Sequence, residues 1–147
     1  MTTPWWDDGA EPLSSDEAQT VDLLRGLRKR DWVVLTDSEA FVDFEAFMPN
    51  DREGCTTSVN FDDAAGVGLQ RLRRDPARNA AHGVVRVSRT TFAQPDPIRA
   101  FMPQIDWNQD PHDRHANLVY DSSLPKRRLR QIASILAVGS TVVPSAS

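Results

Sequence analysis

The sequence contains few of the residues with which many small proteins carry out chemistry. Its 147 residues include one cysteine, three histidines, one tyrosine and only two lysines. A single cysteine, Cys55, excludes an internal disulfide framework and a cysteine-rich zinc site. Reduced, unpaired cysteine is typical of the cytosol. We therefore expect a cytoplasmic protein.

Long apolar runs are also absent. No run approaches the ~20 residues of a membrane-spanning helix, and the first residues, MTTPWWDDGAEP, have neither the basic nor the apolar part of a secretory signal. Apolar residues make up 39% of the chain and charged residues 26%, as in ordinary globular domains. This length suffices for one core. We expect an irregular N-terminal arm over 1–13, a single domain over 14–139 and a short C-terminal tail over 140–147.

Two amphipathic segments predict helices near the two ends of that domain. Ser14 and Glu17 form a capping box ahead of an apolar stripe, which predicts a helix over 15–30. A second stripe, ended by Gly139, predicts a helix over about 123–137. Each stripe occupies one side of its helix, so each helix needs a flat partner surface such as a sheet.

Short β-prone segments lie between the two helices, together with one further helix that we expect from residue 62 or 63 to about 74. The segment 36–50 fits a helical and a strand pattern, and its aromatic content favours a strand. Strands and helices do not alternate as in a parallel sheet. We therefore predict an α+β fold with a mainly antiparallel sheet, packed by an N-terminal and a C-terminal helix. The expected strands cover residues 32–35, 56–61, 83–88, 101–107 and 116–120.

Charge is divided unevenly along the chain. Residues 1–63 contain 15 acidic and 5 basic residues, whereas residues 64–147 contain 6 acidic and 12 basic residues. Either the two halves neutralise each other in the fold, or the asymmetry marks a binding surface. Arginine outnumbers lysine by 15 to 2. Arginine suits two-point binding of carboxylate or phosphate, although a GC-rich genome produces the same bias.

Two arginine clusters are candidate anion-binding surfaces. The first lies in the opening turns of the last predicted helix and comprises Lys126, Arg127, Arg128 and Arg130. The second lies at the end of the middle helix and comprises Arg71, Arg73, Arg74 and Arg78. The helix dipole favours the second cluster but opposes the first, where carboxylates are normally found. Adjacent clusters would bind phosphate or an acidic partner, whereas separated clusters would be ordinary solvated surfaces.

The paired tryptophans of the arm, Trp5 and Trp6, are candidate anchors. Large aromatic side chains are costly to leave in water. They either dock on their own domain, which we expect, or bind a partner.

The loop 106–115 holds the main concentration of potential metal ligands, namely Asp106, Asp110, His112, Asp113 and His115. Carboxylate oxygens and imidazole nitrogens bind divalent metals. Metal sites usually draw ligands from separated elements, however, and aspartates also stabilise ordinary turns. We expect a structural loop, with His112 and His115 not acting as zinc ligands.

Two weaker patterns remain. Cys55 has no sequence feature that brings a histidine base to it, so we expect a small packed side chain rather than a nucleophile. The pair of glycines in Gly66-Val67-Gly68 lacks the rest of a nucleotide-binding motif. We interpret it as permitting close packing.

No motif in the chain is specific for one chemistry, and we expect no cofactor and no membrane partner. The favoured hypothesis is a small, soluble, non-catalytic protein-interaction module, such as an immunity-like, antitoxin-like or accessory bacterial protein. Its basic cluster, with Trp5 and Trp6 as further contacts, would bind an acidic surface of another protein or of a second copy. One alternative is a metal-dependent hydrolase or nuclease that uses the 106–115 loop. Another is a nucleic-acid-binding protein, although the pI of about 5.3 disfavours it.

Overall fold

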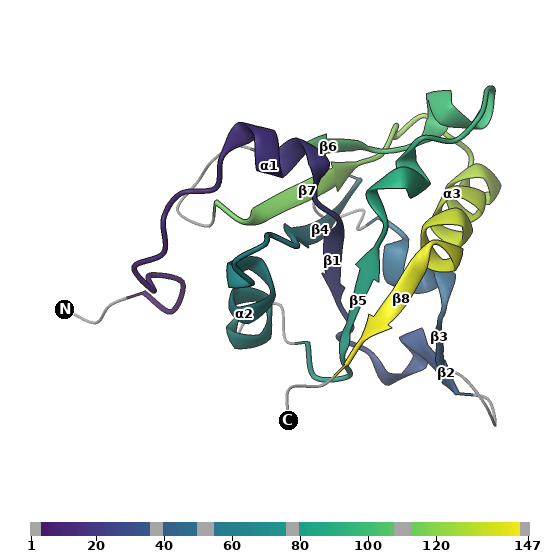
Figure 1. Cartoon of the computed structure of the whole chain (residues 1–147). Helices are drawn as coiled ribbons and strands as arrows, with labels where there is room; N and C mark the ends of the chain where they lie inside the picture. Colours follow the sequence, from purple (N-terminus) through teal and green to yellow (C-terminus); the bar gives the residue numbers. More distant parts are fainter. Residues whose placement is uncertain (1–3, 36–39, 50–54, 76–79, 108–112, 145–147) are drawn as a thin grey trace.

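The computed structural model describes residues 4–35, 40–49, 55–75, 80–107 and 113–144, and it is built around a six-stranded antiparallel sheet (Figure 1). The strand order across the sheet is β6-β7-β4-β1-β5-β8. The six strands are β1 (Leu23–Gly26), β4 (Thr56–Phe61), β5 (Val84–Val87), β6 (Gln104–Asp106), β7 (His115–Val119) and β8 (Ser140–Val143). A separate hairpin is formed by β2 (Val33–Leu35) and β3 (Ala40–Val42).

The described residues also contain three α-helices and several single turns of 3-10 helix. The α-helices are α1 (Ser15–Thr20), α2 (Val67–Arg74) and α3 (Lys126–Val138). The 3-10 turns are η1 (Arg30–Trp32), η2 (Phe44–Phe47), η4 (Arg89–Phe92) and η5 (Ile98–Phe101). The chain is therefore an α+β protein with a mostly antiparallel sheet, as the sequence predicts. Within the part of the chain that the structure describes, none of the helices has the length and apolarity needed to span a membrane.

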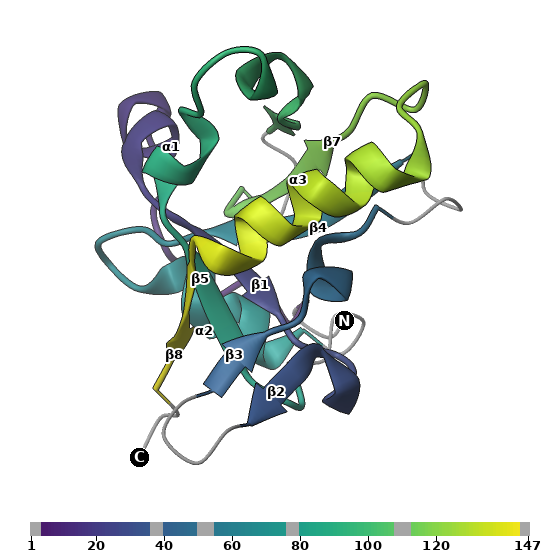
Figure 2. The ribbon, with the colours of Figure 1, turned by 90° about the vertical axis from the view of Figure 1, so that its right-hand side faces the viewer.

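The helices α2 and α3 lie on opposite faces of the sheet (Figure 2). Neighbouring residues of a strand point to opposite faces, and the two apolar clusters follow this alternation. Leu23 shares the larger cluster with α3 residues, whereas the adjacent Leu24 shares a smaller cluster with Leu72 of α2. The face that carries α3 holds the main core, and the face that carries α2 is more polar.

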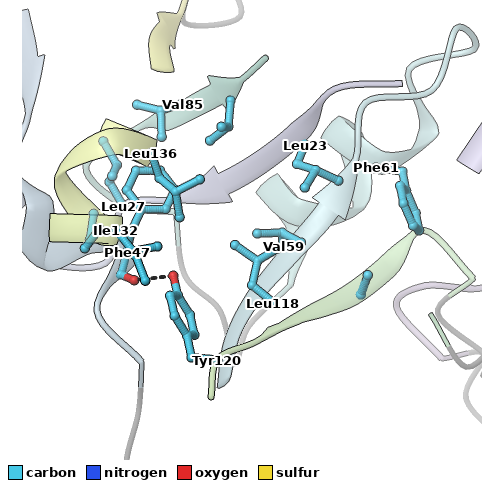
Figure 3. Packing of buried hydrophobic residues seen from close by; sticks show 14 of the residues in the cluster. Leu23, Leu27, Phe47, Val59, Phe61, Val85, Leu118, Tyr120, Ile132 and Leu136 are labelled. Carbon is cyan, nitrogen blue, oxygen red and sulfur yellow. Dashed lines mark hydrogen bonds between the residues drawn. The ribbon is translucent and has the colours of Figure 1, made fainter. Parts of the chain in front are cut away.

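The main core lies between α3, η2 and the sheet (Figure 3). Phe47, Ile132 and Leu136 are fully buried there. Tyr120 follows β7 and donates a hydrogen bond from its hydroxyl to the Phe47 carbonyl at 2.5 Å. This bond joins η2 to the end of β7, and the buried Arg25 of β1 also contacts η2 by donating to the Ala46 carbonyl at 2.9 Å.

The first predicted helix is much shorter than the sequence suggests. Ser14 does cap α1 by accepting from the Glu17 amide at 3.1 Å, but α1 ends at Thr20 and the chain then enters β1. β1 is central and is covered on both faces, so its apolar residues do not alternate with polar ones. Leu23, Leu24 and Leu27 also fit helical spacing, and the prediction of a helix over 15–30 is wrong after Thr20.

The C-terminal segment also differs from the predicted tail. Ser140–Val143 forms β8, the edge strand beside β5, with Val84 opposite Val143 and Val87 opposite Ser140. α3 ends at Gly139, as predicted, and that residue leads directly into β8. The ambiguous segment 36–50 contains both kinds of structure, with β3 as a strand and η2 as a helical turn; residues 36–39 and 50 lie outside the described residues.

Candidate functional site

The N-terminal end of α3 carries three exposed cations, Lys126, Arg127 and Arg130. The helix begins after Pro125, which supplies no side-chain cap, and its first turn contains no acidic residue. The N-terminal end of a helix carries partial positive charge, so cations there are less favourable than carboxylates. These residues therefore do not improve the stability of their own helix.

The outward side of α3 changes from charged to apolar along its length. Residues spaced four, three and four apart lie on one side of a helix, and Arg127, Gln131, Ser134 and Val138 follow that spacing. The buried residue Leu136 lies on the opposite side. Val138, at the far end of the stripe, is 87% exposed. Its position on the solvent side follows from the helical stripe, but the sequence analysis did not single it out.

Arg128, the fourth member of the predicted cluster, is engaged within the protein. Its guanidinium lies 4.6 Å from the ring centre of Phe101 in η5 and donates to Gln131 Oε1 at 2.6 Å. A guanidinium over an aromatic face is held by electrostatic attraction. Arg128 therefore fixes η5 against α3, whereas the other three cations are exposed.

The exposed cations of α3 contrast with three arginines of the C-terminal half that form ion pairs with the N-terminal half. Arg71 pairs with Asp8 at 2.8 Å, Arg86 with Asp62 at 2.5 Å and Arg114 with Asp63 at 3.3 Å. Each pair joins a base of the C-terminal half to an acid of the N-terminal half. Among the described residues, no carboxylate forms an ion pair with Lys126, Arg127 or Arg130.

The second arginine cluster is not adjacent to the first. It belongs to α2, on the other face of the sheet (Figure 2). Arg71 is buried in the ion pairs described above, Arg73 donates to the Pro144 carbonyl at 2.8 Å, and Arg74 is exposed. Arg78 lies outside the described residues. The two clusters do not form one anion-binding surface.

The N-terminal arm is held against α2 and the loop before β7 by charged groups. Both guanidinium edges of Arg71 are used: Nε and Nη2 donate to Asp8 at 3.0 and 2.8 Å, and Nη1 donates to Asp113 at 2.8 Å. Asp113 also accepts from the Leu13 amide at 2.8 Å, and Arg114 donates to the Glu11 carbonyl at 2.6 Å. Trp5 and Trp6 are half-buried.

The ionisation of this network follows from its contacts. Hydrogen bonding from Arg71 holds the pKa of Asp8 well below its ordinary value. Burial alone would raise the pKa of Asp113, but hydrogen bonds from the Leu13 amide and from Arg114 outweigh burial and lower it. The hydrogen bond to Asp8 in turn raises the pKa of Arg71. All three groups are therefore charged over the whole physiological range.

The predicted ligands of the 106–115 loop do not converge. Asp113 is committed to the two arginines and the arm. His115 lies at the start of β7, and Asp106 is exposed at the end of β6. Asp110 and His112 lie outside the described residues. Within the described part of the chain, no three His, Cys, Asp or Glu side chains are grouped closely enough to hold a metal ion.

The cavity beside His115 is small. It is lined by residues that include Trp5, Arg71 and His115, and its volume is about 10 Å³, which is room for about one water molecule. A substrate does not fit there. Cys55, the other candidate for chemistry, is buried immediately before β4, and its carbonyl accepts from the Tyr120 amide at 3.0 Å.

Comparison with known proteins finds no relative: the chain matches no protein-family model, no curated protein and no solved structure.

Proposed function

We propose that this protein is a non-catalytic protein-interaction module, which binds an acidic surface of another protein through the exposed basic end of α3. The binding surface consists of Lys126, Arg127 and Arg130, and we call it the basic end. The observation that carries the proposal is the contrast among the basic residues. Several other arginines of the C-terminal half form ion pairs inside the fold, whereas these three are exposed. Lys126 and Arg127 also occupy the first turn of the helix, which disfavours cations.

The size and charge of the basic end favour a compact acidic patch over nucleic acid. Three cations on one helix neutralise few phosphates, and the second arginine cluster lies on the opposite face of the sheet. The chain as a whole carries a net charge of −4. A long phosphate backbone would be repelled by the acidic surface, because binders of nucleic acid depend on a dominant basic field. A partner protein needs complementarity only over the area of contact.

The lone cysteine supports a cytosolic setting for this interaction. Cys55 is a buried thiol and the sequence has no second cysteine to pair with it, which is compatible with a reducing compartment. Trp5 and Trp6 are half-buried in the docked arm, so we leave them out of the proposed contact surface.

The test compares the wild-type protein with the Arg127→Glu/Arg130→Glu variant. Arg128 is left unchanged because it stacks on Phe101. Proteins captured from extracts of the source cells are quantified by mass spectrometry, and the association rate of each purified candidate is measured over a range of salt concentrations. Exposed charges act mainly on association rate, so the variant should associate about 10-fold more slowly at low salt and show a flatter salt dependence.

The matched control is Arg30→Glu/Arg74→Glu, which makes the same change in net charge at two exposed positions outside α3. The control should bind the partner at the wild-type rate. Equal rates for the wild type and the α3 variant, with every captured protein, would refute the proposal. Slow association by both variants would point to a general effect of net charge and would also contradict it.

A further inference from the structure

Three exposed apolar side chains gather at the C-terminal end of α3, at the other end of the helix from the basic end. Val138 is 87% exposed, Phe41 of β3 50% and Val142 of β8 41%. β3 contacts both β8 and α3, so the three residues belong to one region. Val34, which pairs with Phe41 in the hairpin, is exposed as well. Contiguous exposed apolar surface of this kind marks interaction sites.

Val138 stands between two open hollows. One hollow, of about 640 Å³, lies between the end of α3, β3 and β8. The other, of about 760 Å³, lies between α3 and η4. Each is lined by eight described residues, and Val138 belongs to both sets. None of these lining residues is charged, although 26% of the chain is charged.

We propose that this region is the contact surface of a homodimer, in which Val138 of each copy enters a hollow beside Val138 of the other. A two-fold contact uses the same patch on both subunits, so the patch must be complementary to itself. A protruding side chain next to a hollow meets that requirement in shape. The absence of charge among the described lining residues meets it electrostatically, since a two-fold axis would otherwise oppose like charges.

The number of residues in the proposed contact surface indicates how tightly the two copies should bind. A stable interface uses about 20–30 residues on each side, and the hollows together with Val34 offer fewer. We therefore expect a weak dimer that dissociates on dilution. Lys126, Arg127 and Arg130 line neither hollow, and Arg130 precedes Val138 by eight residues, or about 12 Å along the helix. The basic end therefore stays outside the contact. The dimer surface is distinct from the proposed partner surface.

Sedimentation velocity over about 1 to 500 µM protein tests the proposal, since this range spans the affinities expected of a small interface. The wild type should shift from monomer to dimer as concentration rises. Val138→Arg places a charge in the contact and should weaken self-association at least about 100-fold. Gln19→Arg, which adds the same charge at an exposed position of α1, is the matched control and should dimerise like the wild type.

Mixing Val138→Arg with Val138→Glu provides a rescue experiment. The two side chains meet near the two-fold axis, so the mixture should form a heterodimer whereas each variant alone stays monomeric. A wild type that remains monomeric throughout the range, or a Val138→Arg variant that dimerises normally, would overturn the proposal. Loss of the dimer in Arg127→Glu/Arg130→Glu would also overturn it, because the contact would then involve the basic end. Failure of the partner-binding test leaves these outcomes unaffected.

Discussion

At the residue scale, Gly68 determines how closely α2 approaches the sheet. A Cβ atom built at this position would lie 1.8 Å from the carbonyl oxygen of Phe61 in β4. The Gly68 carbonyl accepts from Asn60 Nδ2 at 2.9 Å, and its amide donates to Asp63 Oδ1 at 2.7 Å. The interpretation of the glycine pair as a packing feature is confirmed at this residue. Gly66 has a different role, since it opens the helix with a φ of 77°.

Replacement of Gly68 by alanine should therefore destabilise the protein strongly. The added methyl group forces α2 away from β4 and strains both hydrogen bonds, at a cost of at least about 2 kcal/mol. Gly66→Ala is the control: no atom lies within 4 Å of its Cβ position, so it should cost only about 1 kcal/mol, from its left-handed backbone. Urea unfolding measures the stability loss of each variant. Similar unfolding midpoints for the two variants would show that α2 can move away from β4 at little cost.

At the element scale, the arm illustrates how contacts distant in sequence escape prediction. The sequence indicates an irregular arm, but nothing in it shows that Asp8 would meet Arg71, 63 residues later. The predicted first helix is too long, because the leucines of β1 face both sides of the sheet and their spacing also fits a helix. β8 was missed because a four-residue strand at a chain end gives little signal. Elements with caps and long stripes, above all α3 with its end at Gly139, were predictable because their signals are local.

The ion pair of Asp8 with Arg71, which we call the clamp, should keep the arm docked on α2 in mildly acidic solution. Asp8 has a folded-state pKa below the ordinary value of about 3.9. Such a carboxylate stabilises the docked arm above its pKa in the free arm, and this contribution is lost as pH falls through the lowered folded-state pKa. The arm should therefore stay docked at pH 4 and detach only in more acidic solution. The pH dependence of the Trp5 indole resonance measures the transition.

Asp8→Asn removes the charge of the clamp and should weaken arm docking by about 1 kcal/mol at neutral pH. Hydrogen exchange at the Leu13 amide, which donates to Asp113, should then become about five-fold faster. Asp7→Asn is the control, because Asp7 is exposed beside it. Equal exchange in both variants would mean that the arm is held by packing of its apolar side chains instead of by the ion pair.

At the scale of the whole molecule, the charge asymmetry of the sequence has two outcomes in the fold. The ion pairs of Arg71, Arg86 and Arg114 join the basic half to the acidic half, as expected if the two halves neutralise each other. The basic end of α3 takes no part in this neutralisation among the described residues. The asymmetry is visible in the sequence, but only the ion pairs of the structure separate cations that support the fold from cations that remain in solvent.

This separation predicts opposite effects on stability for two kinds of arginine substitution. Arg114→Met leaves the carboxylate of Asp63, whose side chain is 1% exposed, buried without its guanidinium, and should lower the free energy of unfolding by about 3–5 kcal/mol. Arg127→Glu/Arg130→Glu instead places carboxylates at the positive end of a helix and should raise it by a few tenths of a kcal/mol. Thermal and urea unfolding of both variants measure these two changes in the free energy of unfolding. A gain in stability in the double variant would agree with the proposal that these cations serve binding and not folding. A clear loss of stability in the double variant would mean that these arginines support the fold, and the proposed basic end would lose its main argument.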